Sequence, residues 1–163
     1  MVIGSLPIGP EGRHHAGRQL LRQMFLAHYG CEPPAIAIAP QGKPYFPGSS
    51  VHFSISHTRD RVFCVLAPHP VGIDAERQDR AIDLRLAQKI LSPTELLRYE
   101  AAADKREALL RLWVLKEAAV KCTGQGLQGY PRHTDFSPED HRITILDGCL
   151  VAVIEKQEAN HAL

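Results

Sequence analysis

Two acidic residues stand at the end of an apolar run and could hold a metal ion. The run reads VGIDAE over residues 71–76, so Asp74 and Glu76 alternate with the apolar Ile73 and Ala75. On a β-strand both carboxylates would face the same way, about 7 Å apart at the backbone. Mg²⁺ is commonly held by one or two carboxylates together with water and substrate phosphate. A strand that runs into a solvated acidic turn gives the same pattern, and for this pair alone that simpler interpretation is favoured.

A second set of side chains lies on a stretch with helical spacing. Trp113, Glu117 and Lys121 recur every four residues and would share one face of a helix, with Lys116 beside them. They could be a core tryptophan and a surface ion pair worth ~0.2–0.5 kcal/mol. Alternatively, Glu117 is a third carboxylate at the metal and Lys121 is a cation for phosphate. The glycines that follow in residues 121–127 allow a sharp turn but do not form the phosphate loop G-x-x-x-x-G-K-[ST].

The first part of the chain is expected to supply a helix and loops. Residues 1–12, rich in Gly and Pro, predict an irregular segment. Residues 13–29 have apolar side chains at helical spacing, and Gly30 is a natural stop. The proline-rich residues 31–49 predict loop, with one short strand over residues 35–38.

Strands and helices then follow in turn. Residues 51–58 and 61–67 flank a polar turn and predict a β-hairpin, which precedes the acidic strand. Helices are expected over residues 81–91 and 106–121, and the sequence SPTE at residues 92–95 is a capping signal for a further helix start. A closing hairpin is expected over 143–146 and 149–155, around an Asp-Gly turn.

Each half of the chain therefore combines a helix with strands, which predicts an α+β fold with two similar lobes. The two halves show no convincing internal sequence repeat. Residues 1–70 carry six Lys/Arg and three Asp/Glu, whereas residues 71–163 carry thirteen and fifteen. This asymmetry suits a phosphate-rich ligand held by the first half and a cation held by the second.

The composition excludes several other classes of protein. Apolar residues make up 44% and charged residues 23% of the chain, and the net charge is +1, without the basic stripe of a nucleic-acid-binding protein. No apolar run approaches the ~20 residues of a membrane span, and the N-terminus lacks the features of a signal peptide. We therefore expect a cytoplasmic protein with no membrane or nucleic-acid partner. The cysteines form no C-x-x-C pair, so reduced thiols are favoured over disulfides or metal ligands.

The order of the motifs resembles the 4′-phosphopantetheinyl transferases, specifically the surfactin-synthetase-activating type. The family's signatures are a (V/I)-G-(I/V)-D-x-E strand and a downstream W-x-x-K-E-A-x-x-K helix that continues as K-x-x-G-x-G-L. The chain has VGIDAE at 71–76, WVLKEAAVK at 113–121 and KCTGQGL at 121–127.

Further motifs upstream extend the resemblance over about residues 10 to 130. The family's G-K-P segment is present at residues 42–44, and its F-N-(I/L)-S-H-S strand corresponds to FSISHT at residues 53–58. The helix that begins at Arg13 is similar to the family's N-terminal basic helix. Ser54 and Thr58 stand where the family usually has Asn and Ser, and the chain is shorter than is common for this type.

The resemblance implies two similar α/β lobes in a pseudo-twofold arrangement. The N-terminal lobe, residues 1–70, would hold the 3′-phosphate and adenosine of coenzyme A, and the C-terminal lobe, residues 71–163, would hold Mg²⁺ (or Mn²⁺) and do the chemistry. The implied reaction moves the 4′-phosphopantetheine arm of coenzyme A to a serine of an apo acyl- or peptidyl-carrier protein and releases adenosine 3′,5′-bisphosphate. Fused lobes imply a monomer, because relatives of half the repeat trimerise.

The resemblance also assigns roles to the acidic strand and the long helix. Asp74, Glu76 and Glu117 would be the metal ligands. Glu117 would also accept the proton of the carrier serine, directly or through water. Lys121 would hold the pyrophosphate and stabilise the transition state.

A second set of residues is assigned to coenzyme A. Arg13, Lys43 and His57 would hold its 3′-phosphate and adenosine end, and Ser56 would hydrogen-bond phosphate. Two other functions remain open: a Mg²⁺-dependent hydrolase of a nucleotide pyrophosphate, which would need no carrier protein, and a protein that binds coenzyme A or a carrier without turnover. The three acidic positions and Lys121 argue against the second.

Overall fold

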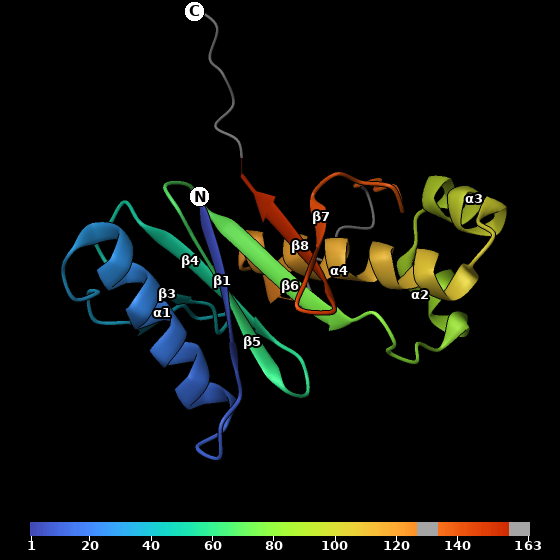
Figure 1. The fold of residues 1–163 in the computed structure, drawn as a ribbon. Helices are drawn as coiled ribbons and strands as arrows, with labels where there is room; N and C mark the ends of the chain where they lie inside the picture. Colours follow the sequence, from blue (N-terminus) through green and yellow to red (C-terminus); the bar gives the residue numbers. More distant parts are fainter. Residues whose placement is uncertain (127–133, 157–163) are drawn as a thin grey trace, which may run out of the picture.

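The computed structural model describes residues 1–126 and 134–156 (Figure 1). Leu127, the last residue of the glycine-rich motif, lies outside the described residues. The elements in chain order are β1 (Val2–Pro7), α1 (Arg13–Tyr29), β2 (Ala37–Ile38), β3 (Pro44–Tyr45), β4 (His52–His57), β5 (Arg61–Ala67), β6 (Val71–Arg77), the 3₁₀-helix η1 (Leu84–Leu86), α2 (Ala87–Ile90), α3 (Pro93–Ala101), α4 (Lys105–Thr123), β7 (Ile143–Leu146) and β8 (Cys149–Glu155).

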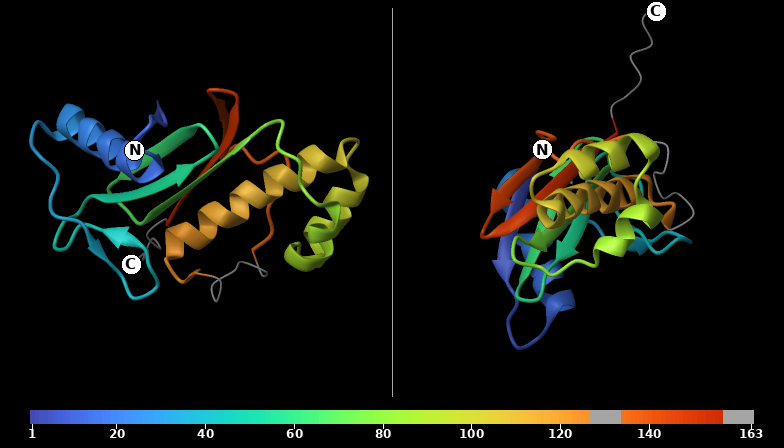
Figure 2. Two further views of the ribbon diagram at one scale, coloured as in Figure 1. Left: turned by 90° about the horizontal axis from the view of Figure 1, so that it is seen from below. Right: turned by 90° about the vertical axis from the view of Figure 1, so that its right-hand side faces the viewer.

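The strands build two principal antiparallel sheets between two helices. One sheet has the order β1-β5-β4 and the other has the order β6-β8-β7. α1 packs on the outer face of the first sheet and α4 on the outer face of the second. The two helices therefore lie on opposite sides of the strands, with α2 and α3 at the end of the molecule farthest from α1 (Figure 2). The predicted combination of helices and strands is confirmed.

β5 lies at the centre of the molecule because both of its faces are buried. The side chains that pack with α1 are Val62, Cys64 and Leu66. The side chains that pack with β6 and β8 are Phe63, Val65 and Ala67. Since alternate residues of a strand point to opposite faces, the continuous apolar run of β5 matches its position between a helix and a second sheet. The inner faces of the two sheets share one core.

Gly72 allows β6 to lie directly against the backbone of α4. A Cβ atom at this position would stand 2.0 Å from the carbonyl oxygen of Ala118 and 2.3 Å from the amide nitrogen of Cys122. Neither backbone atom could move aside without shifting the helix. The close approach brings Asp74, two residues further along the strand, next to Lys121 at the end of the helix.

The predicted helix signals are confirmed where they were strongest. α1 spans the predicted residues and ends at Gly30, whose φ of 71° is left-handed. The capping box of α3 is complete, because the Ser92 side chain accepts from Glu95 N and the Glu95 side chain accepts from Ser92 N. Glu95 is fully buried and also pairs with Lys116 Nζ at 2.8 Å. The predicted Asp-Gly turn between β7 and β8 is present, with positive φ at both Asp147 and Gly148.

Several local predictions are wrong, and the first of them is wrong because pairing with a distant segment decides the structure. The expectation of an irregular segment over residues 1–12 missed β1, which pairs with β5 and packs Gly4 close to Met24 of α1. Residues 81–91 hold only η1 and α2, because Leu91 is already extended before the capped start of α3. The strand expected over residues 35–38 is shorter and pairs with β3, which lies in the predicted loop.

The two principal sheets are built by the same order of elements. The first comes from β1, α1, β4 and β5, and the second comes from β6, α4, β7 and β8. In each sheet the last strand of the set lies between the other two. Among the described residues, no helix is both long enough and apolar enough to cross a membrane.

Candidate active site

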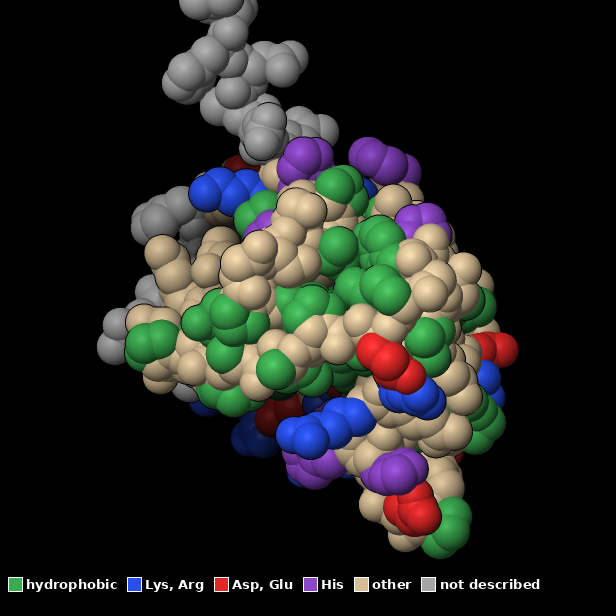
Figure 3. Space-filling model, turned by 90° about the vertical axis from the view of Figure 1, so that its left-hand side faces the viewer, with side chains coloured by type: hydrophobic (Ala, Val, Ile, Leu, Met, Phe, Trp, Pro, Cys, Tyr) green, Lys and Arg blue, Asp and Glu red, His purple; other side chains and the backbone are tan. Residues whose placement is uncertain are grey.

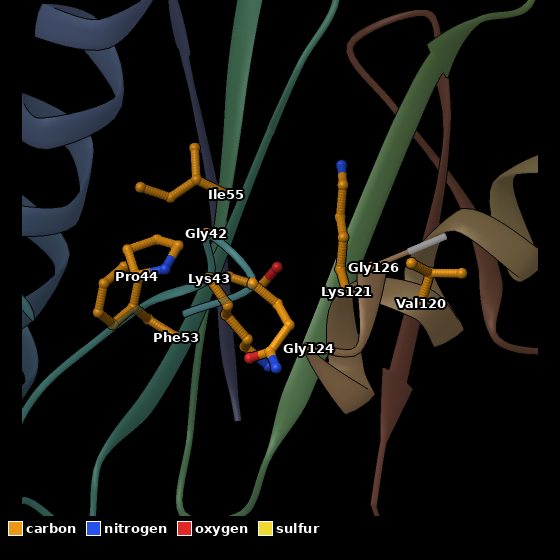
Figure 4. Close-up of a pocket in the computed structure, with 11 residues that line it drawn as sticks. Gly42, Lys43, Pro44, Phe53, Ile55, Val120, Lys121, Gly124 and Gly126 are labelled. Atoms are coloured by element: carbon orange, nitrogen blue, oxygen red, sulfur yellow. The ribbon is translucent and has the colours of Figure 1, made fainter. Parts of the chain in front are cut away.

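A cavity of about 260 Å³ lies between the β2–β3 connection, β4 and the end of α4 (Figure 4). Apolar side chains form one wall and two lysines contribute the positive charge. The lining residues are Gln41, Gly42, Lys43, Pro44, Phe53, Ser54, Ile55, Val120, Lys121, Gly124 and Gly126. The cavity is thus built from both halves of the chain, and from both the G-K-P motif and the last turn of the long helix.

Asp74 is the most constrained carboxylate beside this cavity. It is only 6% exposed. Its Oδ1 accepts a hydrogen bond from the hydroxyl of Ser56 at 3.0 Å and forms an ion pair with Lys121 Nζ at 2.7 Å. Its Oδ2 is buried and has no hydrogen-bond partner among the described residues. One oxygen is therefore anchored by the protein, and the other is left for a group that the protein does not supply.

Glu117 lies within electrostatic reach of Asp74. Burial raises the pKa of the Glu117 carboxyl, and the negative charge of Asp74 raises it further, against the opposing effects of Lys121 and Arg80. Two carboxylates in a partly buried site repel each other and lose hydration. A cation placed between them would relieve both costs.

Glu76 is engaged elsewhere. Its carboxylate pairs with Arg80, whose guanidinium also lies 5.9 Å from the ring centroid of Trp113. Within residues 1–126 and 134–156, no group of three His, Cys, Asp or Glu side chains is close enough to hold a metal ion. The structure therefore places Asp74 and Glu117 within electrostatic reach of each other, and it pairs Glu76 with Arg80.

The remaining oxygen atoms nevertheless suit a hard divalent cation. Mg²⁺ needs few protein ligands, because water and substrate phosphate complete its coordination. The unpaired Oδ2 of Asp74 and the partly buried carboxylate of Glu117 are oxygen donors of the required kind. Glu76 would join them only after Arg80 moves away.

The hydroxyl of Ser56 is occupied by the protein. It donates to Asp74 Oδ1, and it accepts from Lys121 Nζ at 3.0 Å and from Ala75 N at 3.2 Å. The expected bond to a phosphate is therefore not prepared in this structure. The hydroxyl instead joins β4, β6 and α4 at one point.

Lys43 and Lys121 point in opposite directions from the cavity (Figure 4). Lys43 Nζ donates to the carbonyl oxygens of Cys122 at 2.8 Å and Val71 at 3.2 Å. Burial lowers the pKa of Lys43. Its alkyl chain lies against Gly124. Lys43 thus lines the cavity and also ties the β2–β3 connection to the end of α4.

Arg13 begins α1 and His57 ends β4, and both Arg13 and Lys121 lie within electrostatic reach of His57. Partial desolvation, then the positive charges of Arg13 and Lys121, lower the pKa of His57, and His14 adds a smaller effect. The side of the molecule with α1 carries hydrophobic side chains across its centre, with Lys, Arg and His side chains toward its upper and lower edges and Asp and Glu side chains among them in the lower half (Figure 3). The positive charges of Arg13 and Lys121 near His57 suit an anionic ligand.

Some contacts at the site could not be found by spacing rules. Arg80 follows Glu76 by four residues, but the chain is no longer regular there, so a helical rule does not apply. Ser54 accepts the backbone N–H of Ile73 at 3.2 Å, a contact between β4 of one principal sheet and β6 of the other, which lie side by side. The sequence signals for Ser54 were its position on the polar face of β4 and its place in the family's F-N-(I/L)-S-H-S motif, and neither predicts this contact.

Comparisons with known proteins identify the family of the chain. Residues 70–156 match the model of the 4′-phosphopantetheinyl transferase superfamily. A 4′-phosphopantetheinyl transferase from Bacillus subtilis is 33% identical over 116 residues, which cover 68% of this chain and 51% of that protein. The 4′-phosphopantetheinyl transferase gsp of Aneurinibacillus migulanus is 35% identical over 88 residues, 53% of this chain and 36% of that protein. The 4′-phosphopantetheinyl transferase psf-1 of Bacillus pumilus is 34% identical over 143 residues, 80% of this chain and 60% of that protein.

The chain belongs to the 4′-phosphopantetheinyl transferase superfamily, because the matched segment spans more than half of it and carries both signature motifs. Among its relatives it is similar to the surfactin-synthetase-activating type, as the motifs predicted. The chain spans about half the length of the Bacillus subtilis relatives that it matches.

Proposed function

We propose that the protein transfers the 4′-phosphopantetheine arm of coenzyme A to a serine of an apo acyl- or peptidyl-carrier protein. The serine oxygen forms a bond to the β-phosphorus of coenzyme A, and the bond from that phosphorus to the bridging oxygen breaks. Adenosine 3′,5′-bisphosphate leaves, and the serine proton passes to a base. The observation that carries the proposal is Asp74, buried, anchored through one oxygen by Lys121 and left unpaired at the other.

Asp74 and Glu117 would hold Mg²⁺, or Mn²⁺ in its place, and Glu76 would join them once Arg80 is displaced. When bound, the cation would neutralise the negative charge that develops on the pyrophosphate. Glu117 is the candidate base for the serine proton, directly or through water.

Lys121 would contact the pyrophosphate and stabilise its charge in the transition state. It is partly exposed at the cavity, although its ammonium is paired with Asp74 in the free protein. Arg13, Lys43 and His57 would hold the 3′-phosphate and adenosine end of coenzyme A. The apolar wall formed by Pro44, Phe53 and Ile55 would pack against the less polar parts of the ligand.

At the level of the whole chain, we propose two lobes, residues 1–70 and 71–163, related by a pseudo-twofold axis. The identical strand order of the two principal sheets supports this arrangement. The first lobe would serve the adenosine side of coenzyme A and the second the metal and the chemistry. We further propose a cytoplasmic monomer whose partners are coenzyme A and a carrier protein, with no nucleic-acid or membrane partner.

The test is mass spectrometry of purified apo-carrier proteins incubated with coenzyme A, Mg²⁺ and the protein. A gain of the phosphopantetheine mass on a carrier serine supports the proposal and identifies the partner. A parallel reaction without carrier measures the release of adenosine 3′,5′-bisphosphate. If release is equally fast without carrier, the protein is a hydrolase and the proposal is wrong.

A further inference from the structure

Two serines of β4 join the two principal sheets. Ser54 and Ser56 lie on one face of the strand and are 5% and 4% exposed. Their hydroxyls accept the backbone N–H groups of Ile73 and Ala75, both at 3.2 Å. β6 is an edge strand that pairs with β8 on one side only. Buried backbone N–H groups need a hydrogen-bond partner. The two hydroxyls therefore replace the backbone carbonyl oxygens that a neighbouring strand would provide.

The two serines differ in what else they bind. Among the residues that the structure describes, the Ser54 hydroxyl bonds only Ile73 N, whereas Ser56 bonds three groups: Asp74 Oδ1, Lys121 Nζ and Ala75 N. A serine hydroxyl offers one donor and two acceptor positions. Ser56 therefore uses its full capacity, and a phosphate oxygen could bind it only if one of these bonds broke.

The bonds of Ser56 restrict how the Asp74 carboxylate can turn. Oδ1 is held at 3.0 Å by the hydroxyl and at 2.7 Å by Lys121, and both of these groups are themselves bonded to each other. With Oδ1 fixed, Oδ2 keeps its buried and unpaired position. Without the hydroxyl, Asp74 could rotate about its side-chain bonds and pair both oxygens with Lys121.

We propose that Ser56 is a positioning residue, which fixes Asp74 so that one carboxylate oxygen stays free for a divalent cation while Lys121 remains beside it. This inference rests on the proposed function, since it assigns Ser56 to the same site. It replaces the expected phosphate contact of Ser56 with an action through Asp74 and Lys121. Partners that orient metal ligands in this way change metal affinity by ~10–100-fold when they are removed.

The test compares Ser56→Ala with Ser54→Ala, a matched control that loses a bond of the same kind to the same strand. Binding of Mn²⁺ in the presence of coenzyme A is followed by electron paramagnetic resonance, and the thermal midpoint is measured in parallel. Both variants should lower the thermal midpoint, Ser56→Ala by more, because it loses three bonds whereas Ser54→Ala loses one. Only Ser56→Ala should weaken Mn²⁺ binding, by ~10–100-fold.

Equal Mn²⁺ affinities for the two variants would overturn the inference, because Ser56 would then only join the sheets. If Ser56→Ala does not fold, Ser56→Cys fills the site with a slightly larger side chain that is a much weaker donor, and it should give the same loss of affinity. If the wild-type protein transfers phosphopantetheine and binds Mn²⁺, and both variants keep the wild-type Mn²⁺ affinity, only the role of Ser56 is rejected and the proposed function stands. Wild-type protein that neither binds Mn²⁺ nor modifies a carrier would reject both.

Discussion

At the scale of single residues, Asp74 combines near-complete burial with an oxygen that has no partner. An unpaired buried carboxylate oxygen is costly, typically by ~1–3 kcal/mol or more, so such an atom usually has a function. Lys121 and Ser56 lower the cost for Oδ1 alone. The cost therefore remains at Oδ2, where a bound cation would remove it.

Replacing Asp74 with alanine should reduce carrier modification by at least about a hundredfold, the scale of losing an electrostatic group at a reacting centre. The net change in stability should be small, because the loss of the common partner of Ser56 and Lys121, worth ~1–3 kcal/mol, is offset by removal of the buried unpaired Oδ2. Both quantities can be followed in one preparation, by mass spectrometry of the carrier and by urea unfolding. Transfer at the wild-type rate in a folded variant would remove Asp74 from the metal site.

His57 provides a test of the anion site that does not depend on turnover. Its pKa is lowered by partial desolvation and by Arg13 and Lys121. The folded state therefore binds the proton less tightly than the unfolded chain, so the stability that His57 contributes is present above the ordinary pKa of about 6.5 and is lost as the pH falls below it.

We expect an NMR titration of His57 in the free protein to give a midpoint below that ordinary value. Coenzyme A should raise the midpoint, because the negative charge of a nearby phosphate favours the protonated ring. His141, which is 94% exposed at its side chain, serves as the internal control. An unchanged midpoint for His57 in saturating coenzyme A would place the phosphate elsewhere.

At the scale of the elements, the site depends on how closely β6 approaches α4. Gly72 has no room for a side chain, since the nearest obstacles are backbone atoms of the helix. Because Asp74 and Lys121 belong to these two elements, any change in their separation changes the distance between the two side chains.

Gly72→Ala should therefore destabilise the fold by about 3 kcal/mol or more, the upper range for overpacking a rigid site. Gly9→Ala is the matched control, because a Cβ atom there would meet nothing within 4 Å. Thermal unfolding of the two variants checks the difference. A Gly72→Ala protein as stable as the control would show that β6 and α4 can separate at little cost.

Lys43 connects a second pair of elements, the β2–β3 hairpin and the end of α4. Lys43→Met keeps most of the alkyl chain but removes the ammonium. We expect the affinity for coenzyme A to fall more than kcat does, because Lys43 Nζ points away from Lys121 and the proposed chemistry. Calorimetric titration with coenzyme A, compared with kcat at saturation, measures this split; an unchanged affinity would exclude Lys43 from the binding site.

At the scale of the whole molecule, the two halves of the chain share the core formed by β5, β6 and β8. Phe63 and Val65 of the first half are fully buried against the second half. Neither half alone could cover this surface, and exposed apolar patches of that kind are unfavourable in water.

Residues 1–70 and 71–163, produced separately, should therefore fail to unfold cooperatively as monomers. Circular dichroism during heating, with sedimentation to establish the mass of each fragment, tests this expectation. Mixing the two fragments should restore a cooperative transition. A sharp monomeric transition in either fragment would mean that each lobe has an adequate core of its own.

The sequence was sufficient where structure is local and insufficient where it depends on distant partners. Helical spacing predicted α1, and the capping signal predicted the start of α3. β1 could not be predicted, because its strand conformation depends on pairing with β5. At the site, alternation predicted that Asp74 and Glu76 share a face, but the contact of Glu76 with Arg80 depends on how the chain turns after β6.

The shared core also limits how the cavity can accommodate different ligands. Opening the cavity by separating the two halves of the chain would expose the inner faces of both principal sheets to water, and their side chains are almost completely buried. Any adjustment of the cavity to a bound ligand therefore falls to the small β2–β3 hairpin at its rim, whose Ile38 and Tyr45 are exposed to solvent. Under the proposed function, substitutions in this hairpin would change the affinity for the adenosine end of coenzyme A before they change the chemistry.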